Sequence, residues 1–444
     1  PQSVLAQQTL AAIHQMQGRL DEAASCLEKI LVQQPQSAES LVNLARLREQ
    51  QGQVQNAYAL YHRALDLQPE SPYVLAKRGE LFEKEGRLDE AADVFDKGLK
   101  LTPTDPVLNL AVARLGRRQG KHAEALARLE SVSGQATTPE VGAEIQILLG
   151  QLHDHLGHAE RALACMLEGK RRMAQLVDPA GAARPRFLAR VEACRGWLDD
   201  RLTAREATEG TVAGQSPIFL VGFPRSGTTL LEQVLDSHPH LQTLDEKPMA
   251  DRMEAAFNEI AAGAASPLAD LTEAQIVHLR EVYWEEARRH IELRPGALLV
   301  DKLPLNIIRV PLIWRVFPEA RFILALRHPC DVTLSCLMQN FGVNDAMAGF
   351  VSLEGIAQIY AKVMGGWLEN AGRLPLHWQQ IRYEDLITNF EVETRALLEF
   401  LGVGWDDAVL EHTRHAQQRG IINTPSYHQV TQPIYQHARY RWKR

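Results

Sequence analysis

The sequence predicts two differently built regions, an N-terminal α-solenoid of helical hairpins followed by an α/β domain with a central parallel sheet. Two observations predict this. Small residues recur at one constant period through about residue 170, and short apolar segments alternate with helical ones from residue 216 onward. We place the repeats at 1–170, a helical transition and linker at 171–214, and the α/β domain at 215–444.

Glycine, alanine and proline mark the repeat. Glycines recur at equal intervals at Gly18, Gly52, Gly86 and Gly120. Each is followed five residues later by an alanine and preceded seven residues earlier by a small residue. Prolines 35, 69 and 103 keep the same period, and a fifth unit around Gly157 is displaced by three residues that the loop 133–139 absorbs. Small residues let two helices approach closely, so each unit is expected to form a helical hairpin.

This pattern resembles the tetratricopeptide repeat, which places two helices in a unit of about 34 residues. The resemblance implies a concave surface that holds a protein or peptide. The alternative, that the array only rigidifies or dimerises the rest of the chain, stays open, as does the oligomeric state.

In the second region, buried apolar strands alternate with helices. The strands are expected at Ile218–Val221, Ala297–Val300, Arg321–Leu326 and about His377–Arg382. The helices are expected at Thr272–Arg289, Leu312–Phe317, Ile356–Leu368 and Glu391–Leu401. This alternation predicts a parallel sheet covered on both faces. Ligands of such sheets bind beyond the carboxyl ends of the strands, so the residues that follow each strand are the candidates for a site.

The segment 217–236, PIFLVGFPRSGTTLLEQVLD, reads as a strand, a glycine-containing turn and the start of an amphipathic helix. The first N–H groups of a helix have no partner within it, so this order of elements makes an anion cradle. Its spacing is that of a P-loop, but Thr228 stands where the Walker lysine belongs. We therefore expect a phosphate-like group held differently from ATP. An ordinary strand–turn–helix is the alternative reading.

Charged and hydroxyl side chains follow the other strands. Lys302 comes just after the second expected strand, and Arg327 and Ser335 stand eight residues apart after the third. Tyr383 follows the fourth, and a polar tail runs from 424 to 433. Arg327 and Ser335 can meet at one helix start, so they predict a second anion site. Two separated anion sites predict a ligand with two phosphate-like groups.

The stretch PRSGTTLLEQVLDSHP, followed by RHPCDVTLS, resembles the two nucleotide motifs of the sulfotransferase family. The likeness covers about 216–444, and is greatest to tyrosylprotein sulfotransferases and to bacterial proteins that join tetratricopeptide repeats to such a domain. It implies transfer of a sulfuryl group from 3′-phosphoadenosine 5′-phosphosulfate (PAPS) to an acceptor hydroxyl, with 3′-phosphoadenosine 5′-phosphate (PAP) as product and no metal.

The resemblance also implies roles for single residues. The loop around the 5′-phosphosulfate is matched by Arg225, Ser226, Gly227, Thr228 and Thr229. The other nucleotide contacts are matched by Arg327, Ser335, Tyr383, Ser426 and Arg441. For catalysis, Arg225 and Lys302 match cations beside the transferring group, and Glu246 matches the base, with Asp245 as the alternative base.

Two positions depart from the family pattern. His328 follows Arg327 where the family often has aspartate, and the segment around Lys302 lacks the Asn-Lys-Asp-Pro form of the tyrosine enzymes. The second departure puts a tyrosine acceptor in more doubt than PAPS. Protein tyrosine, carbohydrate, lipid and small phenols all remain open as acceptors. A tetratricopeptide scaffold with a non-catalytic nucleotide-binding domain and a P-loop kinase are the competing functions.

Composition limits the partners and the compartment. A net charge of −7 gives no general attraction to nucleic acid or to an acidic membrane. No apolar run approaches the length that a bilayer-crossing helix needs, so no membrane span is expected. Five scattered cysteines in a chain of this length favour a reducing compartment, and we expect a cytoplasmic protein.

Overall fold

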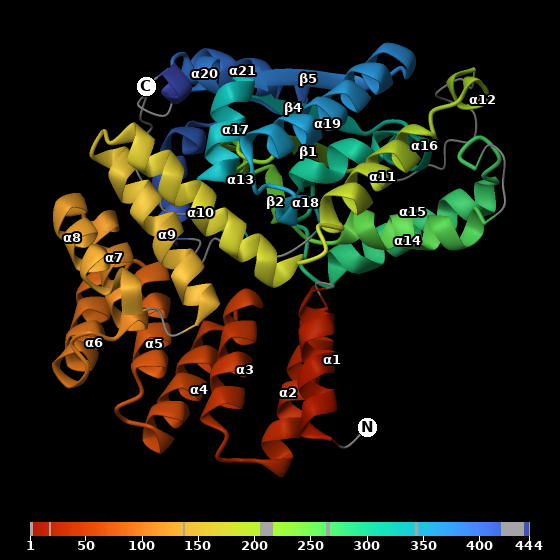
Figure 1. The fold of residues 1–444 in the computed structure, drawn as a ribbon. Coiled ribbons are helices and arrows are strands. Elements are labelled where there is room, and N and C mark those ends of the chain that lie inside the picture. The colour runs from red at the N-terminus through yellow and green to blue at the C-terminus, as the bar shows by residue number, and fades with distance from the viewer. Residues whose placement is uncertain are drawn as a thin grey trace. The chain divides into compact units, whose positions relative to one another are not determined.

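The computed structural model describes residues 3–16, 19–135, 138–204, 216–262, 267–341, 345–418 and 439–443 (Figure 1). They belong to two compact units. Unit 1 comprises Pro1–Gly181 and Met338–Val351, and unit 2 comprises Ala182–Leu337 and Ser352–Arg444.

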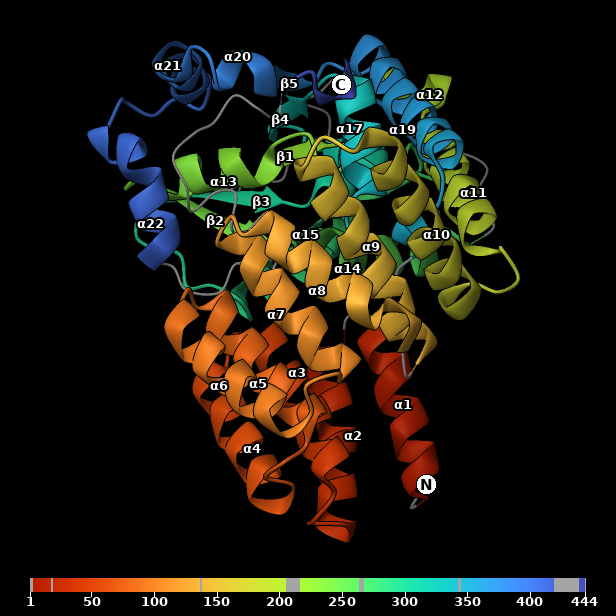
Figure 2. The same cartoon turned by 60° about the vertical axis from the view of Figure 1, so that its left-hand side comes forward.

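Unit 1 contains the five predicted helical hairpins, drawn from red to yellow in Figures 1 and 2. Their helices are α1 Val4–Met16 and α2 Leu20–Gln33, α3 Ala38–Gln50 and α4 Val54–Leu67, α5 Pro72–Lys84 and α6 Leu88–Leu101, α7 Pro106–Arg118 and α8 His122–Val132, and α9 Pro139–His155 and α10 Ala159–Val177. The two helices of each hairpin pack against each other. The α-solenoid predicted for this region is confirmed.

The glycines of the repeat lie in the turns inside the hairpins. Left-handed φ angles of 76° to 79° occur at Gly52, Gly86, Gly120 and Gly157. Glycine adopts this conformation without steric cost. The small residue seven positions earlier serves close packing, because a Cβ at Gly79 would lie 2.2 Å from the ring of Phe95. A Cβ at Gly150 would lie 2.5 Å from Met166. Gly18 lies outside the described residues.

A segment from the second half of the chain belongs to unit 1. Gln151 Nε2 on α9 donates a 2.6 Å hydrogen bond to the carbonyl of Met338. The buried ammonium of Lys170 on α10 donates to the carbonyl of Gln339 and lies 5.5 Å from the centre of the Phe341 ring. We predicted Met338–Val351 as part of the α/β domain, whereas its contacts group it with the last hairpin.

Unit 2 is built on a parallel five-stranded sheet with the order β2-β3-β1-β4-β5. The strands are β1 Ile218–Gly222, β2 Leu241–Asp245, β3 Leu298–Lys302, β4 Arg321–Leu326 and β5 His377–Arg382. Asp245 pairs with Lys302, and Gly222 with Ala325, so the carboxyl ends meet at one edge. Four of these strands were predicted; β2 was missed.

Helices surround the sheet. They are α11 Ala183–Arg195, α12 Asp200–Thr203, α13 Thr228–Asp236, α14 Met249–Ile260, α15 Glu273–Arg288, α16 Val310–Val316, α17 Pro329–Leu337, α19 Leu353–Arg373, α20 Tyr383–Leu386, α21 Phe390–Phe400 and α22 His412–Gln418. A short α18, Asp345–Ala348, belongs to unit 1. The predicted helices α15, α16, α19 and α21 are present. The expected transition 171–214 is divided, because α10 ends in unit 1 whereas α11 and α12 belong to unit 2.

None of the helices in the described ranges has the length and apolar character needed to cross a bilayer.

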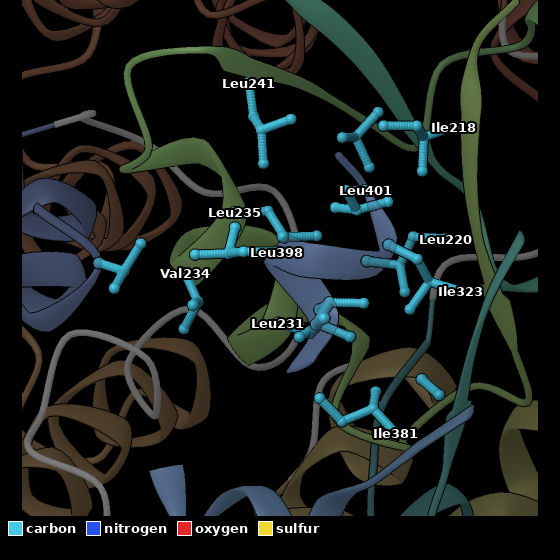
Figure 3. Close-up of a cluster of buried hydrophobic side chains, with 14 of the residues drawn as sticks. Ile218, Leu220, Leu231, Val234, Leu235, Leu241, Ile323, Ile381, Leu398 and Leu401 are labelled. Atoms are coloured by element: carbon cyan, nitrogen blue, oxygen red, sulfur yellow. The ribbon is translucent and has the colours of Figure 1, made fainter. Parts of the chain in front are cut away.

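Apolar side chains cover both faces of the sheet. Ile218 and Leu220 of β1 pack with α13 and α21 in the cluster shown in Figure 3. Phe219, between them in sequence, points to the other face and packs against Tyr283 of α15 and Phe322. Each fully buried side chain of this kind stabilises the fold by roughly 1.5–3 kcal/mol. This core holds α13 firmly on the sheet and so fixes the turn that precedes it.

Candidate active site

The turn between β1 and α13 forms the predicted anion cradle. A Cβ at Gly222 would lie 2.6 Å from the carbonyl oxygen of Ala325, so glycine lets β1 end close against β4. Gly227, at the N-cap of α13, has a left-handed φ of 93° and provides no side chain to cap the helix. The N–H groups of the first turn are therefore not occupied by their own N-cap. The side chains of Ser226, Thr228 and Thr229 are buried around this turn.

Two arginines meet beside the cradle. Arg225 Nε donates a 3.0 Å hydrogen bond to Ser335 Oγ on α17. Arg327 Nη1 donates a 3.2 Å hydrogen bond to the carbonyl oxygen of Arg225. The Arg327 guanidinium also lies over the ring of Tyr383, 4.8 Å from its centre. The structure thus brings together four predicted residues that follow three different strands.

Tyr383 packs closely on the cradle. A Cβ at Gly227 would lie 2.7 Å from its ring. Burial raises the pKa of Tyr383, and the positive charges of Arg327 and Arg225 only partly oppose this rise. Tyr383 therefore carries a neutral hydroxyl at physiological pH.

The segment around Arg441 lies against the start of α17. The backbone N–H groups of Tyr440 and Trp442 donate to the two carboxylate oxygens of Asp331, at 2.7 and 3.1 Å. The Trp442 ring stacks on His328, with 5.0 Å between ring centres. Asp331 was missed by sequence reasoning, because its partners are backbone groups in a distant part of the chain. Ser426 lies outside the described residues.

A second polar cluster lies at the ends of β2 and β3. Lys302 is fully buried, and its ammonium contacts the carboxylates of Asp245, Glu246 and Glu232. The distance from Lys302 Nζ is 3.2 Å to Glu246 and 3.6 Å to Glu232. Burial acts to lower the pKa of Lys302, but the three carboxylates outweigh it and raise the pKa above its ordinary value. Lys302 is therefore a buried cation.

The two candidate bases differ in exposure. The side chain of Glu246 is 45% exposed, whereas that of Asp245 is 16% exposed. Glu246 has a left-handed φ of 51°, and its N–H donates a 2.8 Å hydrogen bond to the carbonyl of Lys302. This backbone turn directs the chain away from the sheet just after β2. Glu246 is thus the more accessible carboxylate of the two.

Two further acids, Glu232 and Asp301, are buried near Lys302. Glu232 is fully buried within α13, and the hydroxyl of Thr243 lies 3.0 Å from one of its carboxylate oxygens. Asp301 precedes Lys302 on β3 and accepts a 2.9 Å hydrogen bond from the Tyr283 hydroxyl. Burial raises the pKa of Asp301 to about 7, although the hydrogen bond from Tyr283 and nearby cations oppose the rise. The available signal for Glu232 was an acid between the apolar residues of the helical segment LLEQVL.

No group of three or more His, Cys, Asp or Glu side chains within the described ranges is placed to hold a metal ion. The positively charged side chains described at the site are those of Arg225, Arg327 and Lys302.

In comparisons with known proteins, the N-terminal and C-terminal regions of the chain match different families. Residues 217–407 match the sulfotransferase family, and 10–72 and 48–115 match tetratricopeptide repeat families. An uncharacterized protein of Aquifex aeolicus (strain VF5) is 30% identical over 242 residues, which are 51% of this chain and 30% of that protein. Protein-tyrosine sulfotransferase 1 of Danio rerio is 28% identical over 247 residues, which are 51% of this chain and 65% of the relative.

Among solved structures, a sulfotransferase domain from the Synechococcus PCC 7002 olefin synthase is 21% identical with a TM-score of 0.36, and the match covers 52% of this chain and 90% of that domain. The chain spans less than two thirds of the length of the two curated relatives that it matches.

Proposed function

We propose, on the premise that residues 217–407 belong to the sulfotransferase family, that this chain moves the sulfuryl group of PAPS to an acceptor hydroxyl and releases PAP. The observation that carries the proposal is the arrangement of positive and hydroxyl groups at one edge of the sheet. Beside the cradle between β1 and α13, Arg225 donates to Ser335, and Arg327 donates to the carbonyl oxygen of Arg225.

The donor is assigned to these two groups. The cradle, from Arg225 to Thr229, is proposed to hold the 5′-phosphosulfate through its backbone N–H groups and hydroxyls. Arg327 and Ser335 are proposed to hold the 3′-phosphate, where charge-assisted hydrogen bonds from arginine are strong. Tyr383, Arg441 and Ser426 are proposed as further nucleotide contacts. The hydrogen bond from Arg225 to Ser335 supports adjacent sites for the two anions.

The reaction is assigned to the lysine cluster. The acceptor oxygen attacks sulfur, and the bond from sulfur to the bridging oxygen of the 5′-phosphate breaks as negative charge develops on that oxygen. Lys302 and Arg225 are proposed to stabilise this charge, which is the main task in such group transfers. Glu246 is proposed to take the proton of the acceptor hydroxyl, because it is more accessible than Asp245.

The repeat array is proposed to recruit the acceptor or a partner protein, as arrays of this kind present extended concave surfaces. The Danio rerio relative is a protein-tyrosine sulfotransferase, so a tyrosine side chain is the first acceptor to test. A cytoplasmic location stays a prediction that rests on the five cysteines.

Radiolabelled PAPS tests the proposal when it is incubated with the chain and with tyrosine peptides, small phenols or sugars. We expect transfer by the wild type, and a rate lowered by about 10²–10⁴-fold in Arg225→Ala and Glu246→Ala. Arg289→Ala is the matched control, because the ion pair described for this exposed arginine joins it to Glu286 of α15. A wild type that neither transfers sulfate nor binds PAP would overturn the proposal.

A further inference from the structure

We infer that Glu232 is a positioning residue for the transfer reaction, the fixed counter-ion that holds Lys302 charged and in place while the exposed carboxylates act on the substrate. The inference rests on the proposed function. Glu232 and Lys302 are both fully buried, and 3.6 Å separates Glu232 Oε2 from Lys302 Nζ.

The cost of burial explains why the two charges occur together. A carboxylate or an ammonium removed from water is strongly unfavourable unless it is paired and hydrogen-bonded. Glu232 has the ammonium of Lys302 on one side and the Thr243 hydroxyl on the other. Both side chains are fully buried, so each charge depends on the other for compensation.

The other two carboxylates of the cluster are placed differently. Asp245 and Glu246 follow each other at the end of β2, and both reach solvent. A base that takes a proton from the acceptor must give up part of its contact with the lysine. Glu232 is closed off from any substrate, so its contact with Lys302 persists through the reaction. The lysine then keeps its charge, and the N–H group released by the reacting carboxylate can turn toward the sulfuryl group.

A chain of polar contacts fixes the orientation of Glu232. The Thr243 hydroxyl lies 3.0 Å from both Glu232 and Asp236, and it donates to one at a time. The N–H of Thr243 donates a 2.9 Å hydrogen bond to Asp236, whose other carboxylate oxygen lies 2.8 Å from His415 Nε2. These contacts connect α13, β2 and α22 around Glu232.

The test compares Glu232→Gln, Glu232→Asp and Thr243→Val with the wild type in the full chain. The control is Glu286→Gln, which neutralises another mostly buried, ion-paired acid, on α15. Titration calorimetry gives PAP affinity, and transfer from radiolabelled PAPS to acceptor or water gives kcat and KM.

For Glu232→Gln we expect kcat to fall about 10–100-fold, because the ammonium of Lys302 loses a close, buried charge partner, with PAP affinity unchanged. Glu232→Asp keeps the charge and should recover part of the rate, and Thr243→Val should lose less than Glu232→Gln. Glu286→Gln should match the wild type.

An unchanged kcat in Glu232→Gln would overturn the inference and leave the proposed function intact. A parallel fall of PAP affinity and kcat, with no recovery in Glu232→Asp, would also overturn it, because that pattern shows only a structural role. If Glu232→Gln does not fold, Glu232→Asp and Thr243→Val decide by the same criteria. A wild type that binds no PAP, or that transfers sulfate to neither acceptor nor water, would overturn the proposed function and the inference together.

Discussion

The two ends of the catalytic edge of the sheet carry opposite kinds of charge. Beyond β1 and β4, two arginines, Arg225 and Arg327, lie together with the hydroxyl of Ser335. Beyond β2 and β3, one lysine lies among three carboxylates. The first arrangement suits an anion that arrives and leaves, whereas the second suits a fixed cation next to a base. Under the proposed function, Arg327 and Ser335 serve donor binding and the lysine cluster serves the chemistry, so variants of these two groups should have different consequences.

The largest effect is expected at the lysine end. Lys302→Met should lower the transfer rate by about 10²–10³-fold, because it removes a cation beside the developing negative charge. It should also destabilise the fold by about 3–5 kcal/mol, since Glu232 is left buried without its ammonium. Adding Glu232→Gln to Lys302→Met should restore the free energy of unfolding, measured in urea, but not the rate. Recovery of the rate in the double variant would contradict the role of Lys302.

Asp301, next to Lys302 on β3, gives this end a pH-dependent stability. Its folded pKa of about 7 lies above the ordinary value, so the folded chain keeps a proton that the unfolded chain releases near pH 4. Its contribution to stability is therefore full below about pH 4 and is lost as pH rises to about 7. The free energy of unfolding of Asp301→Asn minus that of the wild type should therefore increase by about 2–3 kcal/mol when the pH is raised from 5 to 8. Urea titrations at the two pH values measure this gain, and an equal difference at both would contradict it.

At the arginine end, binding should suffer more than chemistry. Arg327→Ala should weaken PAP binding by about 10–100-fold, the usual loss for hydrogen bonds to a charged group. The rate at saturating PAPS should fall less than in Lys302→Met. Calorimetry and initial rates separate the two. A PAP affinity equal to that of wild type would remove Arg327 from the donor site.

The smallest effect is expected from the backbone of the cradle. Gly227→Ala places a methyl group 2.7 Å from the Tyr383 ring, at a φ of 93° that alanine adopts poorly. We expect a destabilisation of about 1–3 kcal/mol, together with weaker PAP binding. Thermal melts with and without PAP test this. An unchanged melting temperature and an unchanged PAP-induced shift would contradict a tightly packed turn at Gly227.

The repeats and most of the α/β domain could be predicted because their causes are local. The left-handed turns at Gly52, Gly86, Gly120 and Gly157 need a glycine, which therefore recurs with the repeat, and buried strands such as Arg321–Leu326 are apolar runs. The β2 strand, Leu241–Asp245, was missed because it is a short edge strand with polar residues at Gln242 and Thr243. Such a segment has too few apolar residues to show a strand period.

For the site, the motifs indicated candidate residues but not the contacts between them. The contact of Arg225 with Ser335 was not predicted, because the two residues belong to motifs that were assigned to separate anion sites. Glu232 lies within the stretch PRSGTTLLEQVLDSHP but received no role there, because its charge partner Lys302 lies on another element much later in the chain. The placement of Met338–Val351 in unit 1 likewise depends on Gln151 and Lys170, which no local pattern connects to it.

Ligand selectivity tests the central claim, two anion sites for one PAPS molecule, most directly. Calorimetric titrations of the wild type would compare PAP with adenosine 5′-phosphate, which lacks the 3′-phosphate, and with ATP in the presence of Mg²⁺. We expect PAP to bind about 10–100-fold more tightly than adenosine 5′-phosphate, because only PAP reaches Arg327 and Ser335. Equal affinities for these two nucleotides, or tighter binding of Mg²⁺–ATP than of PAP, would contradict the account.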